Sequence, residues 1–250
     1  MSDRTLKCVV AYDGTAYQGW QRQADGPTIQ AALEDAFVPL LGSAPVVTGA
    51  GRTDAGVHAL GQVASVRVST SHDVAAIRRA LNARLPADIR VLSVSDAAPE
   101  FHARFAAVGK TYRYRIVTAE VASPFERWFV WHLPGPLRTG EMREAACAIV
   151  GTHDFSSFQA LGSDVEDAVR TITRLEVTST STDVVIEAQG TGFLRHMVRI
   201  LVGTLVDVGS GRRQPTEMTD IVAARDRRAA GDTAPARGLT LVAVDYPPGC

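Results

Sequence analysis

The sequence predicts an α+β fold made of two similar halves with mainly antiparallel sheets. In the first half, valine-rich strand patterns and helical patterns follow the order strand, helix, strand, strand, helix, strand. The second half resembles this order, and each half has the usual size of a domain, about 100–150 residues. The order is typical of ferredoxin-like and RRM-like units, so we expect two such halves.

The first half has a helix signal after Thr28 and another after Asp73, both of which are good N-cap residues. The second helix is expected to end before Pro86, because proline is a strong helix-end signal. The expected strands are residues 5–13, 45–48, 62–68 and 89–95.

The second half is expected to repeat this order with additions. Strands are expected at 110–117, 170–178, 184–188 and 239–246, and helices at 139–150, 193–206 and 217–225. The apolar, aromatic run 125–133 has no counterpart in the first half and is interpreted as an insert. We divide the chain into domain 1–104, which contains the loop 51–59, and domain 105–250, which contains the strand 110–117 and the helix 193–206.

The composition is that of an ordinary globular protein, with 46% hydrophobic and 21% charged residues. The formal net charge of −1 does not indicate a nucleic-acid binder, so any RNA site must come from local separation of charge. Cys8, Cys147 and Cys250 form neither a disulfide framework nor a zinc spacing. With no secretory signal and no apolar run long enough to span a bilayer, the expected location is the cytoplasm.

Residues 51–59, GRTDAGVHA, form the candidate active loop between two strand-like runs. Gly51 and Gly56 bracket Arg52 and Asp54, which are two positions apart and are expected on the same side of the loop. The alternative is a structural turn with an ion pair. Residues 13–21 form a second loop with two glycines and two aromatic residues, for which aromatics folded back over the sheet are the alternative.

Two further stretches suggest RNA. Residues 101–116 carry four basic residues and no acidic one, and place Tyr112 and Tyr114 on one strand face, where a base can stack. The alternative is two core tyrosines beneath an exposed basic face. Arg199 lies on an otherwise apolar helix and needs an anionic partner, either a structural carboxylate, Asp54 or a phosphate. Nucleotide-loop and zinc-protease motifs are absent, so we expect no cofactor and no metal.

Eight motifs occur in the order and approximate spacing of the tRNA pseudouridine synthase A family. They are YDGT at 12–15, GWQ at 19–21, GRTDAGVHA at 51–59, FHAR at 101–104, KTYRY at 110–114, GTHDF at 151–155, FLRHMVR at 193–199 and TAPARGL at 233–239. The chain therefore resembles this family over nearly its whole length, and the motif at 51–59 is the most specific.

The resemblance implies a homodimeric enzyme that isomerises uridine to pseudouridine at nucleotides 38 to 40 of the tRNA anticodon stem-loop. It implies two RRM-like halves joined around a central active-site cleft. The implied roles are catalysis by Asp54, packing of Tyr112 on the target base, pairing of Arg199 with Asp54, base extrusion by Arg52 and lining of the pocket by Leu239. We also count His58, in the loop motif, among the substrate-binding residues.

The reaction explains why one carboxylate is enough, since the detached uracil is kept and rejoined. Asp54 can attack C1′, add to C6 or remove the C2′ proton, and all three routes stay open. Each requires an ionised carboxylate, which Arg199 and Arg52 favour. Tyr112 is expected to stack on the base and to accept the C5 proton. The alternatives are a non-catalytic RNA-binding or folding module and a hydrolase that releases free base.

Overall fold

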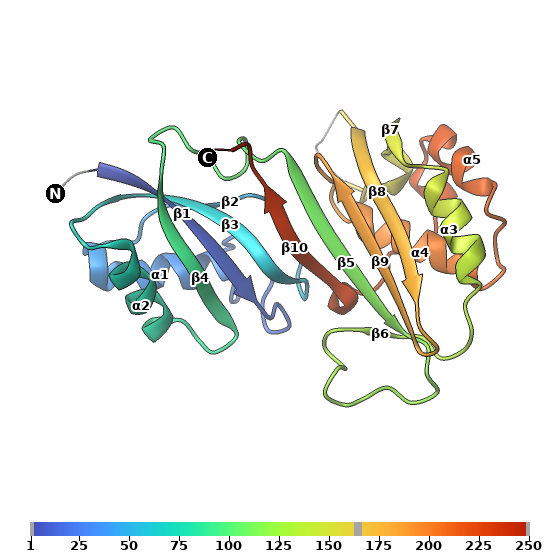
Figure 1. Cartoon of the computed structure of the whole chain (residues 1–250), viewed down its shortest axis with the longest axis horizontal. Helices are drawn as coiled ribbons and strands as arrows, with labels where there is room; N and C mark the ends of the chain where they lie inside the picture. Colours follow the sequence, from blue (N-terminus) through green and yellow to red (C-terminus); the bar gives the residue numbers. More distant parts are fainter. Residues whose placement is uncertain (1–2, 163–166, 249–250) are drawn as a thin grey trace. The chain divides into compact units, whose positions relative to one another are not determined.

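The computed structural model describes residues 3–162 and 167–248 of the 250-residue chain (Figure 1). The chain forms two compact units, one of Met1–Val108 with Leu241–Cys250 and the other of Gly109–Thr240. Each unit contains helices and strands, and the neighbouring strands are mostly antiparallel. The predicted α+β class with mainly antiparallel pairing is therefore confirmed.

The first unit contains two helices and a sheet in which β1 lies between β3 and β4. Its elements are β1 (Asp3–Tyr12), α1 (Ile29–Leu41), β2 (Val47–Gly49), β3 (His58–Ser69), α2 (Val74–Arg84) and β4 (Ile89–Ala97). All pairs are antiparallel, and β2 pairs with β3. The final strand, β10 (Leu239–Asp245), begins in the second unit and enters the first at Leu241.

Both predicted helix caps of the first unit are confirmed. The Thr28 side chain accepts a hydrogen bond from Ala31 N at 3.3 Å, and that of Asp73 accepts one from Ala76 N at 2.7 Å. The two helices pack together, as Figure 1 shows, and bury apolar residues such as Phe37 and Leu81. Hydrogen-bonded caps leave fewer backbone donors unsatisfied, so the helix starts follow from the local sequence.

The strands of the second unit follow the order β5-β9-β8-β7, with β6 parallel to β5. Its elements are β5 (Gly109–Val117), β6 (Trp131–His132), α3 (Thr139–Cys147), β7 (Gly151–Asp154), β8 (Val169–Ser179), β9 (Asp183–Gly190), α4 (Met197–Gly209) and α5 (Glu217–Ala224). Short 3-10 helices span Ser156–Phe158, Arg227–Ala229 and Ala236–Gly238. The predicted insert 125–133 thus contains the short strand β6.

Helix α4 begins later than the sequence predicts. The expected start at residue 193 is wrong because His196 has a left-handed backbone with φ of 62°, which interrupts the helix before Met197. Nearly all of α4 is buried, which explains its apolar sequence. Within residues 3–162 and 167–248, no helix is long and apolar enough to cross a membrane.

Candidate active site

The candidate loop connects β2 to β3, as its flanking apolar runs predict. Ala50 N donates to Val63 O at 2.7 Å, and Val57 N donates to Asp54 O at 3.1 Å, which closes a tight turn. Gly56, the third residue of this turn, has φ of 77°, a value that glycine adopts without steric cost. Asp54 is partly buried at the start of the turn.

Buried polar side chains hold the backbone on the N-terminal side of Asp54. The Tyr12 hydroxyl lies 2.8 Å from Thr53 Oγ1, and Gln62 Nε2 donates to Gly51 O at 2.8 Å. Gln62 Nε2 also lies 3.5 Å from the Tyr12 hydroxyl, at the limit of a hydrogen bond. The buried group of Tyr12, Thr53 and Gln62 therefore ties the candidate loop to β1 and β3.

A β-bulge brings Gln62 into this group. Val10 pairs with Gln62 and Tyr12 pairs with Ala59, so β3 has one more residue than β1 between these pairs. A bulge redirects side chains and is frequent beside functional sites. Gln62 thus pairs with Val10, two residues before Tyr12 on β1, and its side chain is buried. Among the described residues, the Gln62 Oε1 atom has no hydrogen-bond partner.

The second loop, residues 13–21, packs directly against the candidate loop. Trp20 N donates to Thr53 O at 3.0 Å, and Gly56 N donates to Tyr17 O at 3.3 Å. Gly19 has φ of 90°, and a Cβ atom there would lie 2.5 Å from the Thr53 carbonyl oxygen. The Tyr17 and Trp20 side chains are buried, as the alternative of folded-back aromatics predicts. This loop therefore supports the backbone that carries Asp54.

Arg52 and His58 differ in exposure, because Arg52 lies on the surface and His58 lies in the core. Arg52 is exposed, and its Nε donates to Gln21 Oε1 at 3.1 Å. His58 is buried, with both Gly14 N and Asp13 Oδ1 at 3.1 Å from its Nδ1. In this place His58 joins the two loops, and its contact with substrate remains a prediction.

In the second unit, Tyr112 and Tyr114 share the buried face of β5. The Tyr112 ring meets Phe193 edge to face, with centroids 5.3 Å apart, and is 8% exposed. Tyr114 is fully buried, and its hydroxyl donates to Pro235 O at 2.7 Å. The alternative of a core tyrosine therefore describes Tyr114, whereas the stacking role of Tyr112 remains a prediction.

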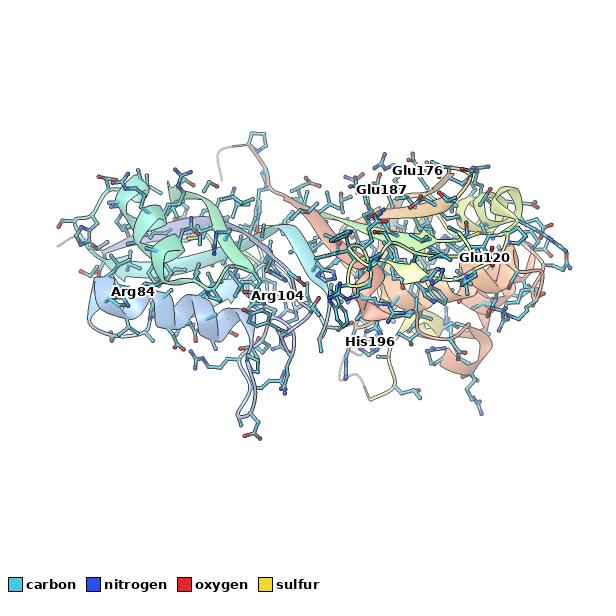
Figure 2. All side chains as sticks on the ribbon, turned by 90° about the horizontal axis from the view of Figure 1, so that it is seen from below. Arg84, Arg104, Glu120, Glu176, Glu187 and His196 are labelled. Atoms are coloured by element: carbon cyan, nitrogen blue, oxygen red, sulfur yellow. The ribbon has the colours of Figure 1, made fainter. Side chains whose placement is uncertain are left out.

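The basic face of β5 is balanced by acidic residues from other segments. Arg113 pairs with Glu187 on β9 at 2.8 Å, and Arg115 pairs with Glu126 at 2.8 Å and with Asp183 at 3.4 Å. Glu187 is labelled in Figure 2. The local charge of +4 counted along the sequence is thus reduced by pairing in space. Arg113 and Arg115 therefore form ion pairs within the protein.

Arg199 lies in the first turn of α4 and binds the segment that precedes β10. Its Nε donates to Ala234 O at 2.8 Å, and its carbonyl accepts from Ala234 N at 3.1 Å. Burial raises the pKa of Tyr114, while the charges of Arg199 and Arg237 lower it by less. Both guanidinium groups therefore lie near Tyr114. Leu239, the first residue of β10, is also buried.

The predicted site residues divide equally between the units. Arg52, Asp54 and His58 belong to the first unit, and Tyr112, Arg199 and Leu239 belong to the second. The pairing of Asp54 with Arg199 remains a prediction. Gln62, Gln21 and Phe193 were not predicted as site residues. Gln21 and Phe193 lie within the motifs GWQ and FLRHMVR, and strand alternation places the polar Gln62 on the same face as Ala64 and Val66.

Comparison with known proteins agrees with the motifs. A family model described as tRNA pseudouridine synthase matches residues 8–106 and 145–247. The chain belongs to the tRNA pseudouridine synthase family. The match includes the candidate loop, Arg199 and Leu239, while Tyr112 lies between the two matched segments. The predicted family and enzyme class, an isomerase that forms pseudouridine from uridine, are confirmed.

The sequence similarity to curated relatives extends over almost the whole chain. The tRNA pseudouridine synthase A of Geobacter sp. (strain M21) is 41% identical over 245 residues, covering 98% of this chain and 99% of the relative. The protein of the same name from Chloroflexus aurantiacus is 45% identical over 250 residues, covering 98% and 90%. A solved Cbf5-Nop10-Gar1 complex shows a distant likeness, with 14% identity and a TM-score of 0.35 over 80% of this chain and 45% of the other.

Proposed function

We propose that the enzyme converts uridine to pseudouridine at nucleotides 38 to 40 of the tRNA anticodon stem-loop, with Asp54 as the nucleophile. The observation that carries the proposal is the fixed backbone on both sides of Asp54. Before Asp54, Gly51 O and Thr53 O accept hydrogen bonds from Gln62 and Trp20, and after it Gly56 N donates to Tyr17 O. Such support is what a catalytic side chain on a loop requires, because small misplacements are costly in rate. The family match over this loop supports the same assignment.

The reaction rearranges one substrate and needs no second reactant. The bond from C1′ to N1 breaks, the uracil turns, and a bond forms from C1′ to C5. The proton leaves C5, N1 gains one, and the atoms balance. A carboxylate serves each of the three open routes, by attack on C1′, addition to C6 or removal of the C2′ proton.

The second unit supplies the other proposed roles. Tyr112 stacks on the uracil while it is detached, and the edge contact with Phe193 supports this ring. Arg199 neutralises Asp54, and its bond to Ala234 O limits the guanidinium to few orientations. Leu239 lines the base pocket, Arg52 helps to extrude the base from its stack, and His58 binds substrate next to Asp54.

The finer architecture belongs to the same proposal. We infer that domains 1–104 and 105–250 are RRM-like halves sharing an active-site cleft. For the first half, two observations support this. The elements follow the chain order strand, helix, strand, strand, helix, strand, and the strands pair in the order β4-β1-β3-β2. We also propose a homodimer that shares the tRNA, in the cytoplasm, where tRNA is modified.

The test is the substitution Asp54→Asn, assayed with unmodified tRNA transcripts and chemical mapping of pseudouridine. The variant keeps the shape of the side chain but removes the charge, so pseudouridine at nucleotides 38 to 40 should disappear while tRNA binding stays within a few-fold. Asp25→Asn, an exposed carboxylate in the first unit, is the matched control and should retain full activity. Activity in Asp54→Asn, or modification at other nucleotides by the wild type, would contradict the proposal.

A further inference from the structure

A segment of the first unit, residues 99–106, is fixed to the sheet by its inward-facing residues. Pro99 O accepts from Thr5 Oγ1 at 3.1 Å, and Ala103 N donates to Ser65 Oγ at 3.1 Å. The Tyr246 hydroxyl donates to Ala103 O at 2.7 Å. These bonds tie the segment to β1, β3 and the end of the chain.

Phe101 anchors the same segment by packing. Its ring lies 5.3 Å from that of Tyr246, and the two rings flank Lys7, whose Nζ is 4.3 Å from the Tyr246 centroid. Phe101 and Ala103 are buried with Ala50 and Val63 in a small core. The backbone around residues 101–103 is therefore rigid, because both its polar groups and its side chains are engaged.

The outward side of the segment presents an aromatic surface, which we call the Phe105 platform: His102, Arg104 and Phe105. Phe105 is 77% exposed. The His102 ring stacks on it with centroids 4.3 Å apart and an interplanar angle of 30°, and the Arg104 guanidinium lies 5.7 Å from the Phe105 centroid. The side chain of Arg104 is labelled in Figure 2. His102 Nδ1 accepts from Arg104 N and Phe105 N at 3.2 and 3.3 Å, which fixes the imidazole.

An exposed phenylalanine is by itself unremarkable, since apolar atoms form much of any protein surface. The Phe105 platform differs because a rigid anchor holds the ring outward and a cation lies beside it. In the part of the chain that the structure describes, no carboxylate forms an ion pair with Arg104, in contrast to Arg113 and Arg115. A fixed aromatic ring can stack on an unpaired base, and a neighbouring cation without an ion-pair partner can bind the phosphate of that base.

We propose that the Phe105 platform stacks on an unpaired base of the tRNA, in addition to the uridine that Tyr112 holds. Phe105 supplies the ring surface, and Arg104 contacts a phosphate beside the same base. The inference rests on the proposed function, because it takes tRNA as the ligand. Stacking on the platform orders the RNA without reading its sequence, since every base has a flat face.

The test compares tRNA binding by wild type and four variants over a range of salt concentrations. Phe105→Leu should weaken binding about 5- to 150-fold, the equivalent of roughly 1–3 kcal/mol for one base stacked on an aromatic ring. Its salt dependence should not change, because no charge is lost. Phe105→Trp should bind within a few-fold of wild type. Arg104→Gln should lower the slope of log affinity against log salt by about 1.

The control is Phe125→Leu, which removes an exposed aromatic ring from the second unit, where Phe125 is 88% exposed. It should bind tRNA as wild type does. Equal affinity of Phe105→Leu and wild type would overturn the inference, as would an equal loss in Phe105→Leu and Phe105→Trp. A change in self-association with unchanged tRNA affinity would assign the platform to a contact between copies and would also overturn it.

The same samples separate this inference from the proposed function. Pseudouridine formation and tRNA binding by the wild type test the function directly. If the wild type neither binds nor modifies tRNA, both proposals fail. If it does both while Phe105→Leu is unchanged, only the stacking role of the platform fails. Thermal unfolding of each variant verifies folding, and these exposed positions should leave the melting temperature unchanged.

Discussion

The two units hold their candidate residues by different means. In the first unit, Asp54 lies on a loop whose position depends on a few hydrogen bonds from Tyr12, Gln62 and the second loop. In the second unit, Tyr112 lies on a strand and Arg199 on a helix, and both elements are packed in the core. The difference means that a single polar substitution can displace Asp54, whereas Tyr112 and Arg199 move only if a whole element moves.

The physical reason is that polar and apolar contacts distribute the free energy of folding differently over the structure. A buried polar group that loses its partner costs about 1–3 kcal/mol at one place, so the loss is felt locally. Apolar packing divides its contribution among many contacts, each worth about 0.1–0.2 kcal/mol. Three substitutions test this contrast, in order of expected effect.

The largest effect is expected from Arg199→Gln. The variant removes the proposed partner of Asp54, and the turnover rate should fall roughly 100-fold, as when one catalytic hydrogen-bond donor is lost. The fold should persist, because α4 is held by its apolar residues. Single-turnover rates at saturating tRNA measure this effect. Arg195→Gln, an exposed arginine just before α4, is the control and should turn over at the wild-type rate; an equal loss in both would show that Arg199 acts only through general charge.

A smaller effect is expected from Gln62→Leu. This change leaves Gly51 O without its donor and should lower the free energy of unfolding by about 1–3 kcal/mol. Because Gly51 begins the loop that carries Asp54, turnover should also fall, while the KM for tRNA changes little. The control is Gln30→Leu, which removes the buried bond from Gln30 Nε2 to Val47 O at 3.0 Å together with the side-chain bonds to Glu34 and Arg22 N.

Urea unfolding and steady-state kinetics of the two variants separate stability from positioning. Both should lose stability, but only Gln62→Leu should lose turnover. If the two variants lose turnover equally, the group of Tyr12, Thr53 and Gln62 has no special part in placing Asp54.

The last effect appears only at alkaline pH. Burial raises the pKa of the Tyr12 hydroxyl to about 12, against smaller lowering effects of the bonds to Thr53 and Gln62. Between the ordinary value of about 10 and this one, the folded state binds more protons than the unfolded state, so stability falls as pH rises. A pKa difference of 1 between the folded and unfolded states corresponds to about 1.4 kcal/mol in the free energy of unfolding. Tyr12→Phe removes this dependence.

Urea unfolding of wild type and Tyr12→Phe from pH 8 to alkaline pH measures the effect. The stability advantage of the wild type should be constant below about pH 10 and shrink above it. A constant advantage across the whole range would mean that Tyr12 ionises as readily in the folded state as in the unfolded state.

The parts of the fold that depend on neighbouring residues were predictable. Thr28 and Asp73 cap their helices because an N-cap bond joins residues three apart. The helix start at Met197 was not predictable from apolar spacing, because the left-handed backbone of His196 leaves that spacing intact. The short strands β6 and β7 were missed for a similar reason, since strands of two and four residues show no alternation to detect.

The candidate site divides in the same way. The sequence by itself determined the α+β class, the family and the loop that carries Asp54, because strand and helix periods and ordered motifs are local signals. Only the tertiary structure decided that Gln62 and Tyr12 support that loop, that Glu187 and Asp183 balance the basic face of β5, and that the chain returns to the first unit at Leu241. These facts depend on contacts between residues far apart in the chain, which local spacing does not encode.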